Sequence, residues 1–113
     1  MALATVSLTA AMICFQGACH PALVGKDTPV GTFPLTQRIV QAEGYGGDVL
    51  QFKETAREVF AVHRVWLGNP AQHRLERLRG PAAGRRGITG GCINVAPEVY
   101  DALIGMTELK VTW

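Results

Sequence analysis

One cysteine and three histidines are the residues of this chain that could carry out nucleophilic catalysis. The cysteine, Cys92, lies in the stretch ITGGCINV, and the histidines are His20, His63 and His73. A thiol with an ordinary pKa near 8.5 is only a few per cent thiolate at pH 7, and a paired imidazolium can lower that pKa by about two units. A nucleophilic Cys92 therefore needs one of the histidines as its base.

The three histidines differ in the elements that are expected to carry them. His63 lies in EVFAVHRVW, which is apolar on both faces, so a side chain that can become charged needs a partner there. From spacing alone, two interpretations of His63 are equally good: a residue of the site, or a hydrogen-bonded residue of the core. His73 lies in an arginine-rich helix and His20 near a hairpin turn, and for both a surface position is the simpler interpretation.

Two glycines directly precede the cysteine. Because Gly90 and Gly91 lack a Cβ atom, successive backbone N–H groups of this stretch can point into one concavity. Beside a nucleophile, the N–H groups of Gly90, Gly91 and Cys92 would form an oxyanion hole. A tight turn without any catalytic role explains the same two glycines, so the triplet by itself is a weak signal.

The sequence predicts a mainly β fold with one or two short helices. Residues 5–14 alternate between apolar and polar and predict one half-buried first strand. Residues 58–66 predict a strand central to the fold, and residues 107–113 an edge or closing strand. Further strands are expected at residues 19–24, 32–40 and 49–52. Helices are expected from Pro70 to just before Gly80, with Asn69 as N-cap, and from Pro97 to Gly105.

Composition limits the classes of protein to which the chain can belong. With 113 residues it is expected to form a single domain over residues 1–113, and its net charge of +2 is too small to suggest binding to nucleic acid. No apolar run is long enough to predict a membrane span. The apolar N-terminal segment has the length of a signal-peptide core, but the first basic residue is Lys26 and no clear cleavage site follows, so we interpret it as a strand.

The other two cysteines flank a predicted hairpin turn. A two-residue turn at Gln16 and Gly17 would place Cys14 opposite Cys19, where a cross-strand disulfide is geometrically possible. Two buried thiols are an equally good interpretation. A metal site that includes His20 is disfavoured because no fourth ligand is in evidence. No metal or organic cofactor is signalled elsewhere.

Three stretches together resemble the L,D-transpeptidase family, which has the YkuD-type catalytic domain. They are TPVGTF (residues 28–33), a strand ending in VFAVH, and TGGCIN (residues 89–94). The family signature is a histidine followed at some distance by [S/T]-H-G-C, an apolar residue, and Asn or Arg. The resemblance covers nearly the whole chain and implies the β-sandwich or barrel of that family, with one or two short helices.

The resemblance also implies catalytic roles. The VFAVH context assigns the base to His63, with a backbone carbonyl near Arg64 orienting its ring, although the fifteen residues between His73 and Thr89 also match the family's common interval. The longer interval after His63 then holds an inserted helix, as in a branch of the family in which the motif histidine is replaced, often by tyrosine. In this chain Gly90 stands at that position.

By resemblance, the Cys92 thiolate attacks a peptidoglycan stem tetrapeptide, releases D-Ala, and passes the acyl group to an amine. Substrate positioning is then expected from Arg64, Thr89, Asn94, Arg85 and Arg86, the arginines because guanidinium groups bind carboxylates. No cofactor is needed, carbapenem-type β-lactams are expected covalent inhibitors, and the family implies a location in the bacterial cell envelope or periplasm. The alternatives are an L,D-carboxypeptidase, a wall-targeting effector, and a weakly catalytic or non-catalytic domain that binds muropeptides.

Overall fold

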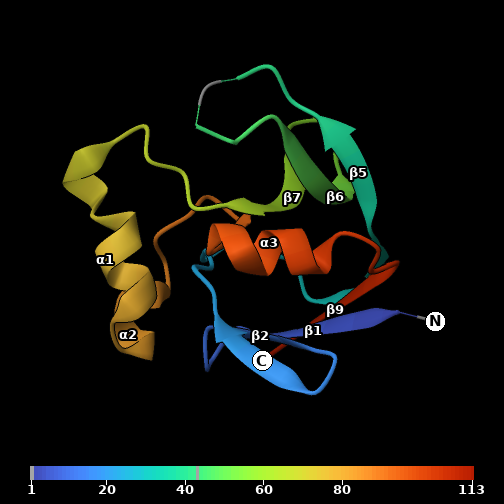
Figure 1. Ribbon diagram of the computed structural model, residues 1–113, viewed down its shortest axis with the longest axis horizontal. Helices are drawn as coiled ribbons and strands as arrows, with labels where there is room; N and C mark the ends of the chain where they lie inside the picture. Colours follow the sequence, from blue (N-terminus) through green and yellow to red (C-terminus); the bar gives the residue numbers. More distant parts are fainter. Residues whose placement is uncertain (1, 43) are drawn as a thin grey trace.

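Two β-sheets form the body of the protein, and the computed structural model describes residues 2–42 and 44–113 of it (Figure 1). The first sheet has the strand order β3-β2-β1-β9-β4 and the second the order β5-β6-β7-β8. The mainly β prediction is confirmed. The strands are β1 (Leu3–Ser7), β2 (Met12–Phe15), β3 (Ala18–Pro21), β4 (Gly31–Pro34), β5 (Thr36–Ile39), β6 (Asp48–Glu54), β7 (Val59–Arg64), β8 (Ile93–Val95) and β9 (Glu108–Thr112).

The prediction of one first strand over residues 5–14 is wrong. The segment is a hairpin of β1 and β2, joined by a turn in which the Ala10 N–H donates to Ser7 Oγ at 3.1 Å and Ala11 has a φ of 52°. Leu8 and Ala11 are both buried within this turn. Apolar alternation therefore continues through the turn, and the pattern reports burial without revealing that the chain reverses.

The C-terminal strand β9 is not an edge strand. It lies between β1 and β4, parallel to β1 and antiparallel to β4. The predicted strand at residues 32–40 is also divided, because β4 belongs to the first sheet and β5 to the second. Local alternation does not specify which strands pair, and both errors have that origin.

The hairpin of β2 and β3 has the predicted turn. Gln16 and Gly17 both have positive φ values, of 52° and 80°, as a two-residue turn of the I′ type requires. Phe15 pairs with Ala18, and Cys14 pairs with Cys19, to which it is joined by a disulfide. The choice between a disulfide and two buried thiols, which the sequence leaves open, is thus decided in favour of the disulfide.

The second sheet brings distant parts of the chain together around β7. This strand lies between β6 and β8, and its residues 60–63 are buried, as predicted for a central strand. It is antiparallel to β6 and parallel to β8, with His63 opposite Asn94. The chain after β3 reaches the same region, since Leu23 forms a bridge with Asn94 and Gly25 a bridge with Thr89.

The helix predicted over residues 97–105 is present as α3 (Pro97–Leu103). It completes the core. Val99, Tyr100 and Leu103 are buried in one cluster with residues of both sheets. Figure 1 shows α3 lying between the sheet of β6 and β7 and the strands β1 and β9. Among the described residues, no helix has the length and apolarity needed to cross a membrane.

The other predicted helix is interrupted. Asn69 caps a 3₁₀ turn over Pro70–Gln72 by accepting from the Ala71 N–H at 3.2 Å, as expected for an N-cap. His73 then has a φ of 50°, and the helix α1 (Arg74–Arg79) begins after it and ends before Gly80. A further short helix, α2 (Ala82–Arg85), was not predicted, so the helices number three besides the 3₁₀ turn within the described residues.

Candidate active site

Cys92 and His63 line the same cavity. This Cys92 pocket has a volume of about 170 Å³ and is lined by Tyr45, His63, Trp66, Arg74, Thr89, Gly90 and Cys92. His63 lies near the end of β7, and Cys92 directly precedes β8. In the parallel pairing of β7 with β8, Val62 lies opposite Ile93 and His63 opposite Asn94, so Cys92, one residue before Ile93, comes close to His63.

The His63 ring is held in one orientation. Its side chain is almost fully buried, and Nδ1 lies 2.7 Å from the carbonyl oxygen of Arg64. A carbonyl can only accept, so Nδ1 carries the proton and Nε2 keeps its lone pair. The expectation that a carbonyl near Arg64 orients the ring is in agreement with this contact. The Tyr45 ring packs edge-on against the imidazole, with 4.7 Å between centroids.

Burial favours the uncharged forms of His63 and Cys92. Burial lowers the pKa of His63 to about 4, although the Arg64 carbonyl acts in the opposite direction, and the charge of Arg74 lowers it further. Burial also raises the pKa of the Cys92 thiol, more than the Ala61 backbone and Arg74 lower it. The lowering of the Cys92 pKa by a paired imidazolium is therefore not found, and the thiol contacts the Val59 carbonyl at 3.7 Å.

Asn94 contacts His63 rather than the open pocket. Its side chain has no exposed surface, and its Nδ2 lies 3.4 Å from His63 Nε2. Its Oδ1 accepts from Arg74 Nη1 at 2.9 Å and from the Trp66 N–H at 3.3 Å. The expectation that Asn94 positions substrate is therefore replaced by a role inside the protein, next to the proposed base.

Arg74 is one of three pocket residues, with Tyr45 and Trp66, that the sequence did not identify. Its guanidinium lies over the Trp66 ring, 5.1 Å from the centroid, and its Nε donates to Gln72 Oε1 at 2.8 Å. Burial lowers the pKa of Arg74, while Tyr45 and Cys92 act in the opposite direction. Arg74 is the first residue of α1 and directly follows His73, which has a φ of 50°.

The three arginines expected to bind substrate carboxylates are not brought to the Cys92 pocket. Arg64 donates to Asp48 Oδ1 at 2.9 Å and lies over the Tyr100 ring. Arg85 is buried and donates to the carbonyl oxygens of residues 10, 11 and 80. Arg86 donates to the Thr9 carbonyl at 2.6 Å. Their contacts instead hold loops and strand ends together.

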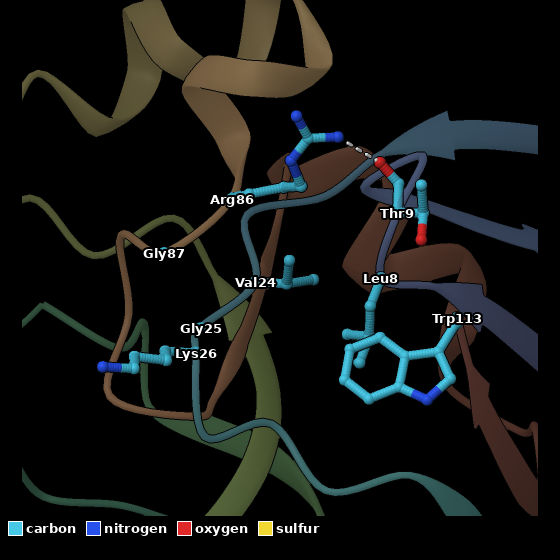
Figure 2. A pocket seen from close by; sticks show the side chains of 8 residues that line it. All are labelled: Leu8, Thr9, Val24, Gly25, Lys26, Arg86, Gly87 and Trp113. Atoms are coloured by element: carbon cyan, nitrogen blue, oxygen red, sulfur yellow. Dashed lines mark hydrogen bonds between the residues drawn. The ribbon is translucent and has the colours of Figure 1, made fainter.

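Arg86 lines a different and wider cavity of about 690 Å³. Figure 2 shows Trp113 beside Leu8 in this cavity, Arg86 bonded to Thr9, and the Lys26 side chain directed away from Trp113. Its lining residues include no cysteine and no histidine. Of these two cavities, the smaller Cys92 pocket is therefore the one that contains a cysteine and a histidine.

Two threonine hydroxyls hold the loop that carries the cysteine. Thr89 Oγ1 donates to the Cys92 carbonyl at 2.6 Å and accepts from the Gly91 N–H at 3.2 Å. Thr28 Oγ1, from TPVGTF, donates to the Gly91 carbonyl and accepts from the Gly25 N–H, both at 2.9 Å. Thr89 lines the pocket, but its hydroxyl serves the loop, and Thr28 was not identified from the sequence.

The two glycines of this loop are not equivalent. Gly91 has a φ of 136°, and a Cβ on it would lie 2.4 Å from a carbon of the Phe60 ring, so glycine is required there. A Cβ on Gly90 would meet no atom within 4 Å. Since the Gly91 N–H already donates to Thr89, an oxyanion hole in this conformation would use the N–H groups of Gly90 and Cys92.

The remaining histidines lie outside the Cys92 pocket. His73 is exposed and its Nδ1 lies 3.8 Å from Glu76 Oε2, while His20 packs against the Phe15 ring. Among the described residues, no group of three or more His, Cys, Asp or Glu side chains is arranged to hold a metal ion. Of the two candidate bases, the structure places His63 in the pocket with Cys92.

The solved structures that are similar to this chain include several L,D-transpeptidases. L,D-transpeptidase 3 from Mycobacterium tuberculosis matches over 99% of this chain and 61% of its own, with a TM-score of 0.66 and 13% identity. An L,D-transpeptidase from Mycobacterium smegmatis matches over 99% and 58%, with a TM-score of 0.60 and 20% identity. One from Xylanimonas cellulosilytica matches over 98% and 60%, with a TM-score of 0.63 and 16% identity.

The chain spans about three fifths of the length of these structures. Neither a family model nor a curated protein matches its sequence. At 13 to 20% identity, the agreement is one of backbone arrangement over almost every residue of this chain. The protein therefore has the L,D-transpeptidase fold.

Proposed function

We propose that the protein is a cysteine-dependent L,D-transpeptidase that acts on peptidoglycan stem tetrapeptides. The observation that supports this best is the pocket shared by Cys92 and His63, in a chain with the L,D-transpeptidase fold. The parallel pairing of β7 and β8 produces this meeting from residues that lie far apart in the sequence. Thr89, Gly91 and Asn94, which match the family motif, stabilise the same arrangement.

In the proposed reaction, the Cys92 thiol replaces the Asn94 amide at His63 Nε2. Nε2 takes the thiol proton as the sulfur attacks the carbonyl carbon of the third residue of the stem. A C–S bond forms, and the N–H groups of Gly90 and Cys92 stabilise the oxyanion. The imidazolium then gives its proton to the leaving nitrogen, the C–N bond breaks, and D-Ala departs. An amine acceptor loses a proton to His63 and attacks the thioester, which releases the thiol.

Substrate recognition is assigned to Arg74 instead of Arg64, Arg85 and Arg86. Stem peptides carry free carboxylates, and Arg74 is the arginine that lines the pocket with Cys92. The proposed substrate is part of the cell wall, so we place the protein in the bacterial cell envelope. The disulfide between Cys14 and Cys19 supports that placement, because such bonds persist in oxidising compartments.

The function is tested with purified disaccharide tetrapeptide, with and without an amine acceptor, followed by mass spectrometry. We expect D-Ala release and an acyl product joined to the acceptor. Intact-protein mass spectrometry after exposure to a carbapenem should show one adduct, located on Cys92. L,D-transpeptidase 3 from Mycobacterium tuberculosis has been crystallised with a faropenem-derived adduct, and this chain shares its fold. Hydrolysis without transfer would indicate an L,D-carboxypeptidase, and neither release nor adduct a binding domain.

Gly90→His is expected to be tolerated and to raise the rate of D-Ala release by roughly fivefold, the effect of one added hydrogen bond of about 1 kcal/mol. The position has room for a side chain, and the substitution places an imidazole where the resembling motif has one. The melting temperature should change little. Gly91→Ala is the matched control, and it should lower the melting temperature because its Cβ would meet Phe60. A large loss of stability in Gly90→His would contradict the prediction.

A further inference from the structure

We infer that Arg74 is a positioning residue for His63, acting through Asn94 to hold the imidazole in one tautomer and in its neutral form. The inference deepens the proposed function, since it rests on the assignment of His63 as the base. Three consecutive contacts carry it: Arg74 Nη1 to Asn94 Oδ1 at 2.9 Å, Asn94 Nδ2 to His63 Nε2 at 3.4 Å, and His63 Nδ1 to the Arg64 carbonyl at 2.7 Å.

The amide of Asn94 can face these groups in one way only. Its oxygen lies between two groups that only donate, the Arg74 guanidinium and the Trp66 N–H. Reversing the amide would place its NH₂ group against both donors, and Asn94 has no exposed surface through which water could compensate. The NH₂ group must therefore face His63, and a donor there requires the lone pair on Nε2. Arg74 and the Trp66 N–H thus orient Asn94, which acts together with the Arg64 carbonyl to leave the lone pair of His63 on Nε2.

The positive charge of Arg74 also favours the neutral form of His63. The guanidinium is half-buried and is held over Trp66 with its Nε on Gln72, so it stays beside the pocket. A fixed cation there disfavours a second proton on His63 and favours the thiolate of Cys92.

The other titratable and charged groups around the pocket make different contacts. Tyr45 faces His63 with its ring edge, and Glu58 acts on Cys92 by raising its pKa. The Arg64 guanidinium is directed to Asp48 and Asp101, away from its neighbour His63 in the chain. Arg74 is thus the charged side chain that contacts the Asn94 and His63 pair.

The test uses the whole protein without substrate. In ¹⁵N-histidine spectra, wild-type His63 should be protonated on Nδ1 and titrate near pH 4. Arg74→Met should raise that midpoint by roughly one pH unit, as expected for loss of a nearby charge, and populate the second tautomer. Arg74→Lys keeps the charge and should return the midpoint towards the wild-type value. Arg79→Gln removes an exposed charge from the same helix and should leave the midpoint unchanged.

Alkylation of Cys92 by iodoacetamide provides a second readout. Cys14 and Cys19 are joined, so Cys92 is the free thiol of the described residues. The pH at which alkylation becomes fast should rise in Arg74→Met, and the reaction at neutral pH should be slower than in wild type, because a positive charge near the thiolate is lost. Iodoacetamide is uncharged, so binding of a substrate carboxylate by Arg74 does not enter this measurement.

An unchanged His63 midpoint and tautomer in Arg74→Met would overturn the inference, as would an equal shift in Arg79→Gln or a failure of Arg74→Lys to restore the midpoint. If Arg74→Met does not fold, Arg74→Gln is the second neutral variant and is interpreted in the same way. Neither readout needs turnover. A protein that shows these shifts but releases no D-Ala would contradict the proposed function and leave the inference standing.

Discussion

Cys92→Ala is expected to lower D-Ala release from a disaccharide tetrapeptide by at least about a thousandfold, because the variant has no atom that can form the thioester. The fold should persist. The Cys92 sulfur makes a long contact of 3.7 Å with the Val59 carbonyl, and the loop is held by the Thr89 and Thr28 hydroxyls, which the substitution leaves in place.

The measurement is product formation by mass spectrometry over a series of enzyme concentrations, with wild type, Cys92→Ala and Cys92→Ser side by side. The serine variant keeps the shape of the side chain but has a hydroxyl, a far weaker nucleophile beside a base with a pKa of about 4. Both variants should also fail to gain mass from a carbapenem. Release of D-Ala at the wild-type rate by Cys92→Ala would refute the nucleophile assignment.

His63→Gln is expected to lower kcat/KM by about a hundredfold to ten-thousandfold, the usual contribution of a positioned general base. Glutamine keeps the size and polarity of the side chain but has no lone pair that takes a proton near neutral pH. His73→Gln is the matched control. His73 is exposed beside Glu76 and outside the Cys92 pocket, so its substitution should leave kcat/KM unchanged. Loss of activity in His73→Gln alone would show that the base has been misassigned.

His63→Gln is also expected to change how the free energy of unfolding depends on pH. The pKa of His63 is about 4 in the folded protein and near 6.5 in the unfolded chain, so between these pH values the unfolded chain binds one proton more. The free energy of unfolding should fall as the pH decreases from about 6.5 to about 4, by up to about 3 kcal/mol for a group as buried as this one. Denaturant titrations at several pH values should show this loss in wild type and a smaller one in His63→Gln.

Several features of the site could be predicted from local sequence because each depends on neighbouring residues. The turn at Gln16 and Gly17 has the residues that positive φ values favour, and it brings Cys14 opposite Cys19. The buried strand carrying His63 is visible in its apolar residues on both faces. TGGCIN and TPVGTF indicate the cysteine loop and the segment that holds it, and the structure joins them through Thr28 and Gly91.

The errors concern residues whose role depends on what packs against them. A charged residue in a sequence does not reveal the direction of its side chain. Arg64 and Arg85 donate to Asp48 and to backbone carbonyls inside the protein, whereas Arg74 lines the pocket. Asn94 matched the motif, but it is completely buried and contacts His63 instead of lining the pocket.

By itself the sequence therefore determined the nucleophile candidate, the hairpin that sets Cys14 opposite Cys19 and a mainly β fold, because alternation, turn residues and motifs are local properties. The tertiary structure decided three other matters: that His63 rather than His73 shares a pocket with Cys92, that Gly90 has room for a side chain while Gly91 has none, and that Arg74 is the pocket's cation. The reason is that strand pairing and side-chain direction depend on contacts between residues far apart in the chain, such as the parallel pairing of β7 with β8.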